Sequence, residues 1–456
     1  MVRKLYYTAG VNRKRTTGGC KILSSFSHAN LFRNIVKNIV RSKSMTQTKT
    51  SRMTRADYIA VLRQELAPAT GCTEPVAIAY AVAKAASFLS GPVESIQVSV
   101  SRNMMKNAMG VGIPGAGASG IDLAAALGAF GGDADAVLEV LHNITPQNVE
   151  QAQEFRQHHV TIALKDTPER LYIEATVRSG TDTVIVVIQG SHTNIVKITK
   201  NGETLFQGCD AAAKPAGAAR VADLTVEGIC RFVSSVNAEE LSFLRETVEP
   251  THRIAAEGGA HNYGLRVGKT AYEAVAHSGS FDDGCDYAAA LAAAAADARM
   301  SGCQMPVATL CGSGNQGITA TVPVIATCDY FHFSEETCLR ALALSCLITI
   351  HVKSFIGRLS PICGCGMGSS IGVCAAVTFL FGGGPGQIGD AIRNVIADVS
   401  GIICDGAKAG CALKVATVVN SAFRSARLAL HGLGAGSLDG IVSGEVETSI
   451  RNSGRL

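Results

Sequence analysis

Cysteines and glycines gather in a few short loops of this 456-residue chain, and a thiol can serve as a metal ligand or simply as a small buried side chain. The densest group is Cys363, Cys365 and Cys374, which glycines surround in a stretch without charge between Arg358 and Asp390. Two interpretations compete for this stretch. One is a buried helix that happens to contain thiols, and the other is one side of a metal site.

Two more cysteines stand in polar glycine loops. Cys72 lies in GCTEP, where Pro75 predicts the first turn of a helix. A thiol near a helix N-terminus is expected to have a lowered pKa and to be a better ligand, although a threonine cap beside an idle cysteine is the alternative. Cys404 opens CDGAKAGC, and Cys411, seven residues later, could share its helix face.

The spread of these thiols over separate loops bears on the kind of metal. Structural zinc usually takes two close CxxC pairs, and the sequence has none. Single cysteines arriving from several directions fit an iron–sulfur cluster better, and three ligands instead of four would leave one iron free for a substrate. The competing interpretation is that most of the 15 cysteines are buried core residues, as we expect for Cys374.

Two other glycine loops carry polar groups. The stretch 106–117 could offer backbone N–H groups to a carboxylate or a phosphate. Its spacing matches neither a Walker loop nor a dinucleotide fingerprint, and a tight connection is an equally good interpretation. In CGSGNQG, Asn315 and Gln316 could hold a carboxylate or an amino group.

The elements that must position these loops indicate an α+β protein. Hydrophobic residues make up 47% of the chain and charged residues 17%, which suits a large buried core. The predicted helices include 54–66, 76–89 and about 121–129. Residues 93–101 alternate as a strand, four β-rich runs between 158 and 208 indicate an antiparallel meander, and apolar helices separated by glycine loops follow from about residue 224.

We therefore predict a large Ala/Gly-rich helical domain that carries the cluster site, and a smaller antiparallel β-sheet domain with flanking helices. The predicted boundaries are a leader at 1–52, N-terminal helices of the catalytic domain at 53–92, the sheet domain at 93–209 and the helical domain at 210–456.

The leader is basic. Residues 1–56 contain thirteen Lys or Arg and no Asp or Glu, with many Ser and Thr and an amphipathic stretch. This composition is typical of a mitochondrial-type transit peptide, which predicts an organelle matrix. The alternative is an upstream stretch before a true start at Met45 or Met53, which predicts a cytoplasmic protein.

The composition also limits the partners. The net charge is only +4 and its excess lies in the leader, so no nucleic-acid partner is expected. The uncharged stretch 359–389 is interrupted by GGGPG, so no membrane span is expected there. The scattered cysteines indicate reduced thiols, a small-molecule substrate is the expected partner, and a homo-oligomer is an open alternative.

Five motifs, taken together and in their order, resemble the L-cysteine desulfidase family, which is similar to the α chain of bacterial iron–sulfur L-serine dehydratases. They are PATGCTEPVAIAYAVAKA, KNAMGVGIPG, GSGNQGI, HVKSFIGRLSPICGCGMGSSIG and ICDGAKAGCALKV. The resemblance runs from about Met53 to Leu430. It implies a PLP-independent lyase with an oxygen-sensitive 4Fe–4S cluster held by three cysteines. The implied reaction converts L-cysteine and water to pyruvate, ammonia and hydrogen sulfide.

The matching motifs carry the family's site residues over to this chain. The implied cluster ligands are Cys72, Cys404 and one of Cys363 and Cys365, with Cys411 as a further candidate. Candidates for the base and its orienting groups are His261, Lys106, Asp405 and Lys408, each with a structural role as the alternative. Groups suited to the substrate carboxylate and amino group are Asn107, Asn315 and Gln316.

Three other functions compete. An L-serine dehydratase would use the same cluster with hydroxide leaving, but such enzymes usually carry an SSSHT-type loop where this chain reads TGCTEP. A clusterless binding or regulatory protein would keep the fold without iron. A cysteine-nucleophile hydrolase needs a Cys–His pair, and nothing in the sequence sets His261 or His351 beside a cysteine.

Overall fold

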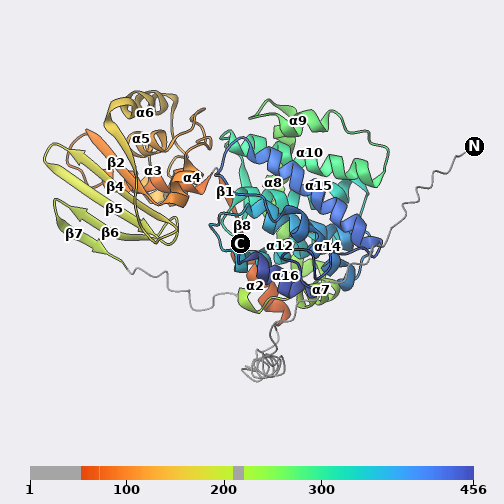
Figure 1. Cartoon of the computed structure of the whole chain (residues 1–456). Helices are drawn as coiled ribbons and strands as arrows, with labels where there is room; N and C mark the ends of the chain where they lie inside the picture. The colour runs from red at the N-terminus through yellow and green to blue at the C-terminus, as the bar shows by residue number, and fades with distance from the viewer. Residues whose placement is uncertain (1–52, 71, 209–219) are drawn as a thin grey trace, which may run out of the picture. The chain divides into compact units, whose positions relative to one another are not determined.

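The computed structural model describes residues 53–70, 72–208 and 220–456, so the predicted leader lies outside the described residues (Figure 1). Residues Met53–Leu456 form one unit by their contacts. Within it, one hydrophobic core lies between a six-stranded sheet and the helices packed on it, and another fills a helical region. The predicted α+β class, with a large helical part and a smaller sheet, is confirmed.

The six-stranded sheet has the order β3-β2-β4-β5-β6-β7. Its strands are β2 (Ser95–Val100), β3 (Val160–Leu164), β4 (Tyr172–Ser179), β5 (Asp182–Gln189), β6 (Ile195–Lys200) and β7 (Glu203–Gln207). Strands β4 to β7 form an antiparallel meander, in which the last of the four predicted runs contains both β6 and β7. Strand β2 joins β4 antiparallel. Strand β3, however, pairs with β2 in parallel, so the sheet is mixed. The parallel pair follows from the helical crossover between β2 and β3, because parallel strands need a long connection.

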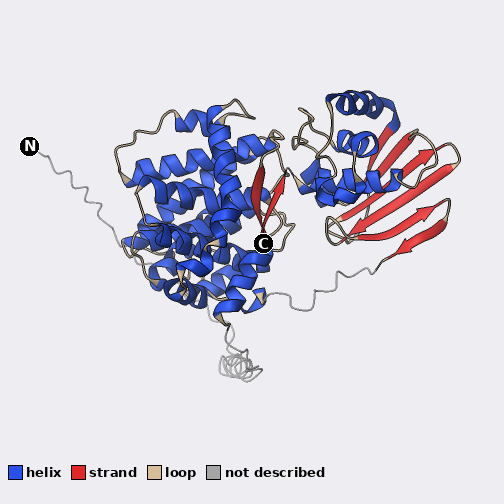
Figure 2. Cartoon of the chain, turned by 180° about the vertical axis from the view of Figure 1, so that it is seen from behind, coloured by secondary structure: helices blue, strands red, loops and turns tan. Residues whose placement is uncertain are grey.

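Helices of that crossover, together with α3 (Thr73–Ala86), cover one face of the sheet (Figure 2). The crossover helices are α4 (Arg102–Ala108), α5 (Ile121–Gly131) and α6 (Pro146–His159). Helix α3 packs against α5 so closely that a methyl group on Gly128 would lie 2.3 Å from the carbonyl oxygen of Ala79. Residues 53–92 were predicted to belong to the helical domain, but the core of α3 belongs with the sheet.

The helical region surrounds the alanine-rich helix α10 (Phe281–Met300), whose neighbours include α8 (Phe243–Ala260), α11 (Gly314–Tyr330) and α15 (Cys411–Leu430). Small side chains let these helices approach closely, and a methyl group on Gly258 or Gly268 would lie 2.0 Å from the backbone of Ala294. Helix α2 (Arg55–Glu65) begins with a capping box that Thr54 and Asp57 form. Its Tyr58 stacks on Phe232 at 4.7 Å, which fixes α2 to the helical region.

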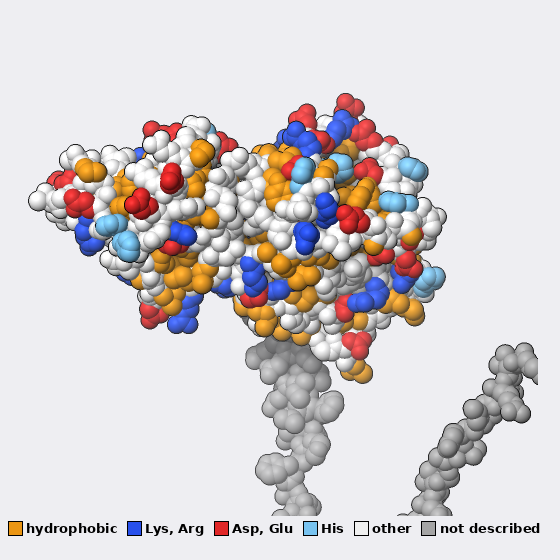
Figure 3. Space-filling view, turned by 90° about the horizontal axis from the view of Figure 1, so that it is seen from above, with side chains coloured by type: hydrophobic (Ala, Val, Ile, Leu, Met, Phe, Trp, Pro, Cys, Tyr) orange, Lys and Arg blue, Asp and Glu red, His pale blue; other side chains and the backbone are white. Residues whose placement is uncertain are grey.

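The remaining helices of this region are α7 (Val226–Ser235), α9 (Val267–Tyr272), α12 (Glu335–Ile356), α13 (Ser370–Leu380), α14 (Pro385–Val399) and α16 (Val446–Ser453). Between the predicted helices 54–66 and 76–89 lies a strand, β1 (Leu66–Thr70), which pairs antiparallel with β8 (Pro306–Leu310). Among the described residues, α12 has the length and composition of a membrane span, and 83% of its most apolar 18-residue stretch is buried inside the protein. Acidic and basic side chains are interspersed on the face seen in Figure 3.

Candidate functional site

The loops that carry Cys363 and Cys404 run side by side as a short antiparallel ribbon. The N–H of Cys363 donates to the carbonyl of Ile402 (2.9 Å), and the N–H of Cys404 donates to the carbonyl of Pro361 (2.7 Å). Successive side chains of an extended strand point to opposite faces. Cys363 and Cys404 therefore project from the same face of the ribbon, although they come from distant parts of the sequence.

Cys365 begins a π-helical turn, Cys365–Ser369, that leads into α13. Its thiol donates a hydrogen bond to Cys363 and thereby lowers the pKa of Cys363 to about 6, although burial opposes the shift. The same hydrogen bond raises the pKa of Cys365 well above its usual value. The hydrogen bond therefore makes the two thiols of the CGC sequence unequal, with Cys365 as the donor and Cys363 as the acceptor.

Cys72 and Cys411 bring two further loops to this region. They share a small buried cluster whose other members are Val111, Met300 and Ala407. Cys411 begins α15, and its thiol also lies within electrostatic reach of Cys363 and Cys404. The thiols named as candidate ligands thus come together from the loops before α3, before α13 and before α15.

The thiol of Cys72 is buried and donates to the Glu74 Oε2 atom (2.9 Å). Burial, followed by the charge of Glu74, raises the pKa of Cys72, so the lowered value predicted from its place before α3 is wrong. Burial also disfavours the charge of Glu74, yet His192, the Cys72 thiol and the Asn107 amide hold the pKa of Glu74 below its usual value. The Asn107 Nδ2 atom donates to Glu74 Oε1 at 3.0 Å, which places Asn107 in the site.

His192 is a site residue that the sequence did not reveal. It lies in the turn between β5 and β6, and its Nε2 atom is buried without a hydrogen-bond partner among the described residues. Burial lowers the pKa of His192, and the charges of Glu74 and Arg358 act on it in opposite directions. The polar run His-Thr-Asn between two apolar strands was the available signal.

Lys353 also escaped the sequence reasoning. This residue of α12 is 4% exposed, and its Nζ atom donates to the carbonyl of Arg358 (3.4 Å). Burial lowers the pKa of Lys353, and the charges of Cys311, Cys365, Cys404 and Cys363 oppose that shift. The signal was a lysine in an otherwise apolar helix, because lysine is almost never fully buried unless it is paired. It sets an amino group beside the thiols, and burial disfavours the charged form of that group.

Three of the candidate bases lie next to Cys404. The Lys106 Nζ atom donates to the carbonyl of Ser360 (3.3 Å), and Gly110 forms a parallel bridge with Lys408. The carboxylate of Asp405 is exposed and pairs with Lys408 and Lys414, which hold its pKa well below its usual range. A carboxylate held in this way is a weak base.

Among the described residues, no hydrogen bond or ion pair joins the fourth candidate base, His261, to the thiol loops. Its side chain is 63% exposed at the end of α8, and its Nδ1 atom lies 3.1 Å from Glu257 on the same helix. Its proposed part in the chemistry stays a prediction, and its position gives that prediction no geometric support.

The amide residues at the start of α11 reach the CGC loop. Asn315 Oδ1 accepts a hydrogen bond from Arg299 (3.0 Å), which fixes its orientation. The Gln316 side chain stands so close to Gly364 that a methyl group there would lie 2.8 Å from it. Gln316 Oε1 is buried and has no partner in the part of the chain that the structure describes, so it is free to accept a bond from a ligand.

The donor set can be compared with the cluster that the sequence implies. Among the described residues, no three or more His, Cys, Asp or Glu side chains are arranged to hold a single metal ion. A 4Fe–4S cluster places its irons at separate corners, so its thiolates need not meet at one point. Thiols from three loops, with the Lys353 amino group beside them, form a donor set whose chemistry fits such a cluster.

Gly406 controls how the Cys404 loop meets α4. Its φ is +102°, and a methyl group would lie 2.0 Å from the carbonyl oxygen of Lys106. We expect Gly406→Ala to lower the free energy of unfolding by about 2 kcal/mol, because strain and a backbone clash add together. Thermal unfolding would measure this. The control is Gly410→Ala, where φ is −62° and the nearest atom lies 3.7 Å away. Equal losses in the two variants would contradict the close approach.

The comparisons with known proteins agree with one another. A family model described as the serine dehydratase alpha chain matches residues 135–456. A UPF0597 protein of Oleidesulfovibrio alaskensis is 42% identical over 400 residues, which cover 88% of this chain and 93% of the relative. Relatives with the same name from Shewanella oneidensis (42% identity, 88% and 94% coverage) and Clostridium perfringens (39% identity, 87% and 92% coverage) match similarly. The chain therefore belongs to the UPF0597 family, which is similar to the serine dehydratase alpha chain.

Proposed function

We propose that the protein is an iron–sulfur-dependent, PLP-independent L-cysteine desulfidase. This carbon–sulfur lyase would convert L-cysteine and water to pyruvate, ammonia and hydrogen sulfide. The observation that carries the proposal is the meeting of three thiol loops beside two buried polar atoms, Gln316 Oε1 and His192 Nε2, that have no hydrogen-bond partner among the described residues. Such groups are unusual in a folded core and are expected where a ligand binds.

Cys72, Cys363 and Cys404 would hold the cluster, with Cys411 beside them. We choose Cys363 over Cys365 because Cys363 shares a ribbon face with Cys404, whereas Cys365 begins the π-helical turn and donates to Cys363. When bound, a 4Fe–4S cluster with three protein thiolates offers an iron that acts as a Lewis acid on the substrate.

The polar side chains suit an amino-acid substrate. The Lys353 Nζ atom can donate a hydrogen bond to a substrate carboxylate or a leaving thiolate, and a negative charge beside it favours its protonated form. The Gln316 Oε1 atom can accept a hydrogen bond from the substrate ammonium group. Asn315 stands beside Gln316 at the start of α11, and its hydrogen bond from Arg299 fixes its orientation.

His192 is our preferred base for the α-proton. A neutral imidazole nitrogen that is buried and unpartnered can accept a proton, and the nearby Glu74 carboxylate would stabilise the imidazolium that forms. Loss of the α-proton and of hydrosulfide from L-cysteine, which together make one hydrogen sulfide, leaves aminoacrylate. Water then converts aminoacrylate to pyruvate and ammonia, so the reaction balances.

L-serine dehydratase is the second candidate, and it is favoured by the match to the family model described as the serine dehydratase alpha chain. The same groups would remove the α-proton of serine, and hydroxide would leave instead of sulfide. The TGCTEP sequence in place of an SSSHT-type loop supports the desulfidase.

The test is anaerobic purification with cluster reconstitution, an iron count and side-by-side assays of L-cysteine and L-serine. We expect a coloured protein with about four irons. It should release sulfide and pyruvate from cysteine at a kcat/KM at least about tenfold above that for serine. A higher value for serine would favour the dehydratase. A colourless, iron-free protein that is inactive on both substrates would contradict both the desulfidase and the dehydratase proposals.

A further inference from the structure

A second pair of cysteines lies far from the thiol loops, at the opposite end of α11. Cys328 follows Gln316 by twelve residues on this helix, which is about 18 Å at 1.5 Å per residue. Its partner Cys338 lies in the first turns of α12. Cys328 is 4% exposed, whereas Cys338 is only partly buried. The pair therefore has an inner and an outer thiol.

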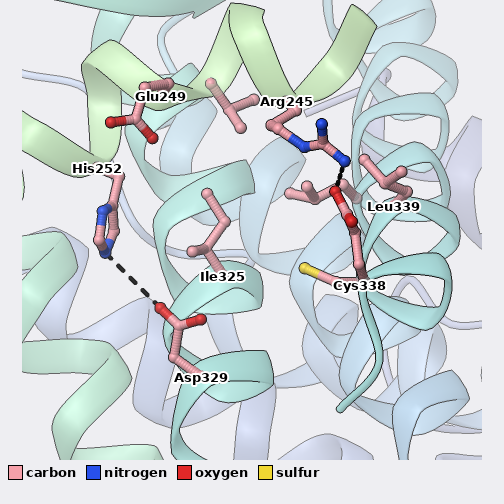
Figure 4. A pocket seen from close by; sticks show the side chains of 10 residues that line it. Arg245, Glu249, His252, Ile325, Asp329, Cys338 and Leu339 are labelled. Atoms are coloured by element: carbon pink, nitrogen blue, oxygen red, sulfur yellow. Dashed lines mark ion pairs between the residues drawn. The ribbon is translucent and has the colours of Figure 1, made fainter. Parts of the chain in front are cut away.

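The outer thiol opens into a pocket of about 270 Å³ between α8, α11 and α12 (Figure 4). Its apolar floor consists of Val248, Ile325, Leu339 and Leu342. Both signs of charge line its rim. Arg245 pairs with Glu335, and His252 lies 3.7 Å from Asp329. A pocket with an apolar floor and a rim of mixed charge fits a small molecule that carries amino and carboxylate groups on a short apolar body.

The two thiols have different acidity. The Cys328 thiol donates a hydrogen bond to Cys338, which lowers the pKa of Cys338, whereas the same bond and burial raise the pKa of Cys328. The thiolate is the nucleophile in disulfide exchange, and access decides which thiol reacts first. Both properties select Cys338 as the attacking sulfur and leave Cys328 behind it as the resolving thiol.

We propose that Cys338 and Cys328 form a thiol–disulfide exchange site for low-molecular-weight disulfides that carry amino and carboxylate groups. The Cys338 thiolate attacks one sulfur of the small disulfide, a mixed disulfide forms, and a small thiolate leaves. Cys328 then gives up its proton and attacks the Cys338 sulfur, and the second small thiol leaves. The protein pair is oxidised to a disulfide, and one small disulfide is reduced to two thiols.

The site is separate from the proposed cluster, so its test does not depend on the lyase activity. Purified full-length protein is reduced, freed of reductant and exposed anaerobically to cystine or glutathione disulfide, and its peptides are then mapped by mass spectrometry. We expect a Cys328–Cys338 link in the wild type. In Cys328→Ser we expect a stable mixed disulfide on Cys338, because no resolving thiol remains. In Cys338→Ser we expect Cys328 to stay reduced.

A buried thiol outside the pocket, Cys230, is the matched control, and it should stay reduced under the same conditions. Arg245→Ala should slow the reaction with cystine about fivefold and leave the reaction with neutral hydroxyethyl disulfide unchanged, because only cystine offers carboxylates to the pocket. A wild-type protein without the Cys328–Cys338 link would overturn the proposal. So would a Cys338 thiol that reacts no faster than Cys230. Equal slowing with both disulfides would overturn the charged-ligand part.

Discussion

Replacing Cys404 with alanine is expected to remove the iron and the activity together. Cys404 and Cys363 project from one face of the ribbon, so the change deletes one of the thiolates proposed to hold the cluster. Loss of a Lewis acid worth several kcal/mol in the transition state predicts a fall in kcat/KM of at least about a thousandfold. An iron count and the visible spectrum of the anaerobically reconstituted variant, with a sulfide-release assay, measure the effect.

The matched control is Cys374→Ala. Cys374 is fully buried in α13, and its thiol donates to the carbonyl of Ile371 on the same helix. This variant should keep its iron and most of its activity while losing about 1 kcal/mol of stability, as expected for a small cavity. A Cys404→Ala protein with a full complement of iron would remove Cys404 from the ligand set.

The same measurements separate the two thiols of the CGC sequence. Cys363→Ala should lose iron as Cys404→Ala does. Cys365→Ala should keep it, because Cys365 serves as a hydrogen-bond donor to Cys363. If Cys365→Ala loses the iron and Cys363→Ala retains it, the assignment taken from the ribbon geometry is reversed.

The sequence predicted where helices and strands lie better than it predicted which elements pack or pair with each other. The alternating runs after residue 158 identified β4 to β7, because a half-buried strand shows its period of two directly. Alternation does not encode the direction of a partner, so the parallel pairing of β3 with β2 was missed. The two histidines before β3, which the sequence assigned to that run, instead end α6. The alanine-rich sequence of α3 likewise shows that the helix is buried but does not show which element it packs against, so its packing with the sheet was not predicted.

The candidate site divides in a similar way. Thiols and amides in glycine loops can be identified from the sequence, because such loops have few other reasons to be polar. His192 and Lys353 could not be identified, because each acquires its meaning only from distant residues that fold against it. The pKa of Cys72 was predicted in the wrong direction because burial and the charge of Glu74 outweigh the helix N-terminus.

Replacing His192 with asparagine should separate proton transfer from cluster binding. Asparagine keeps a polar side chain of similar reach but cannot accept the α-proton, so kcat for L-cysteine should fall by a factor of about 10² to 10⁴. The iron content should not change, because no thiol is altered. The change in the visible spectrum on adding L-cysteine should persist, because Gln316 and Lys353 remain. Steady-state kinetics and an iron count on the same preparation measure both effects.

Two further histidine variants make this result specific. His142→Asn, on an exposed turn where the Nδ1 atom forms a hydrogen bond with the carbonyl of Glu139, should behave as the wild type. His261→Asn tests the base that the sequence suggested, and its exposed position predicts less than about a twofold effect. With α-deuterated L-cysteine, the isotope effect on kcat should be larger in His192→Asn than in the wild type, because proton removal becomes slower than the later steps. If His261→Asn instead causes the large loss and His192→Asn does not, the base lies at the end of α8 and the buried imidazole has a structural role.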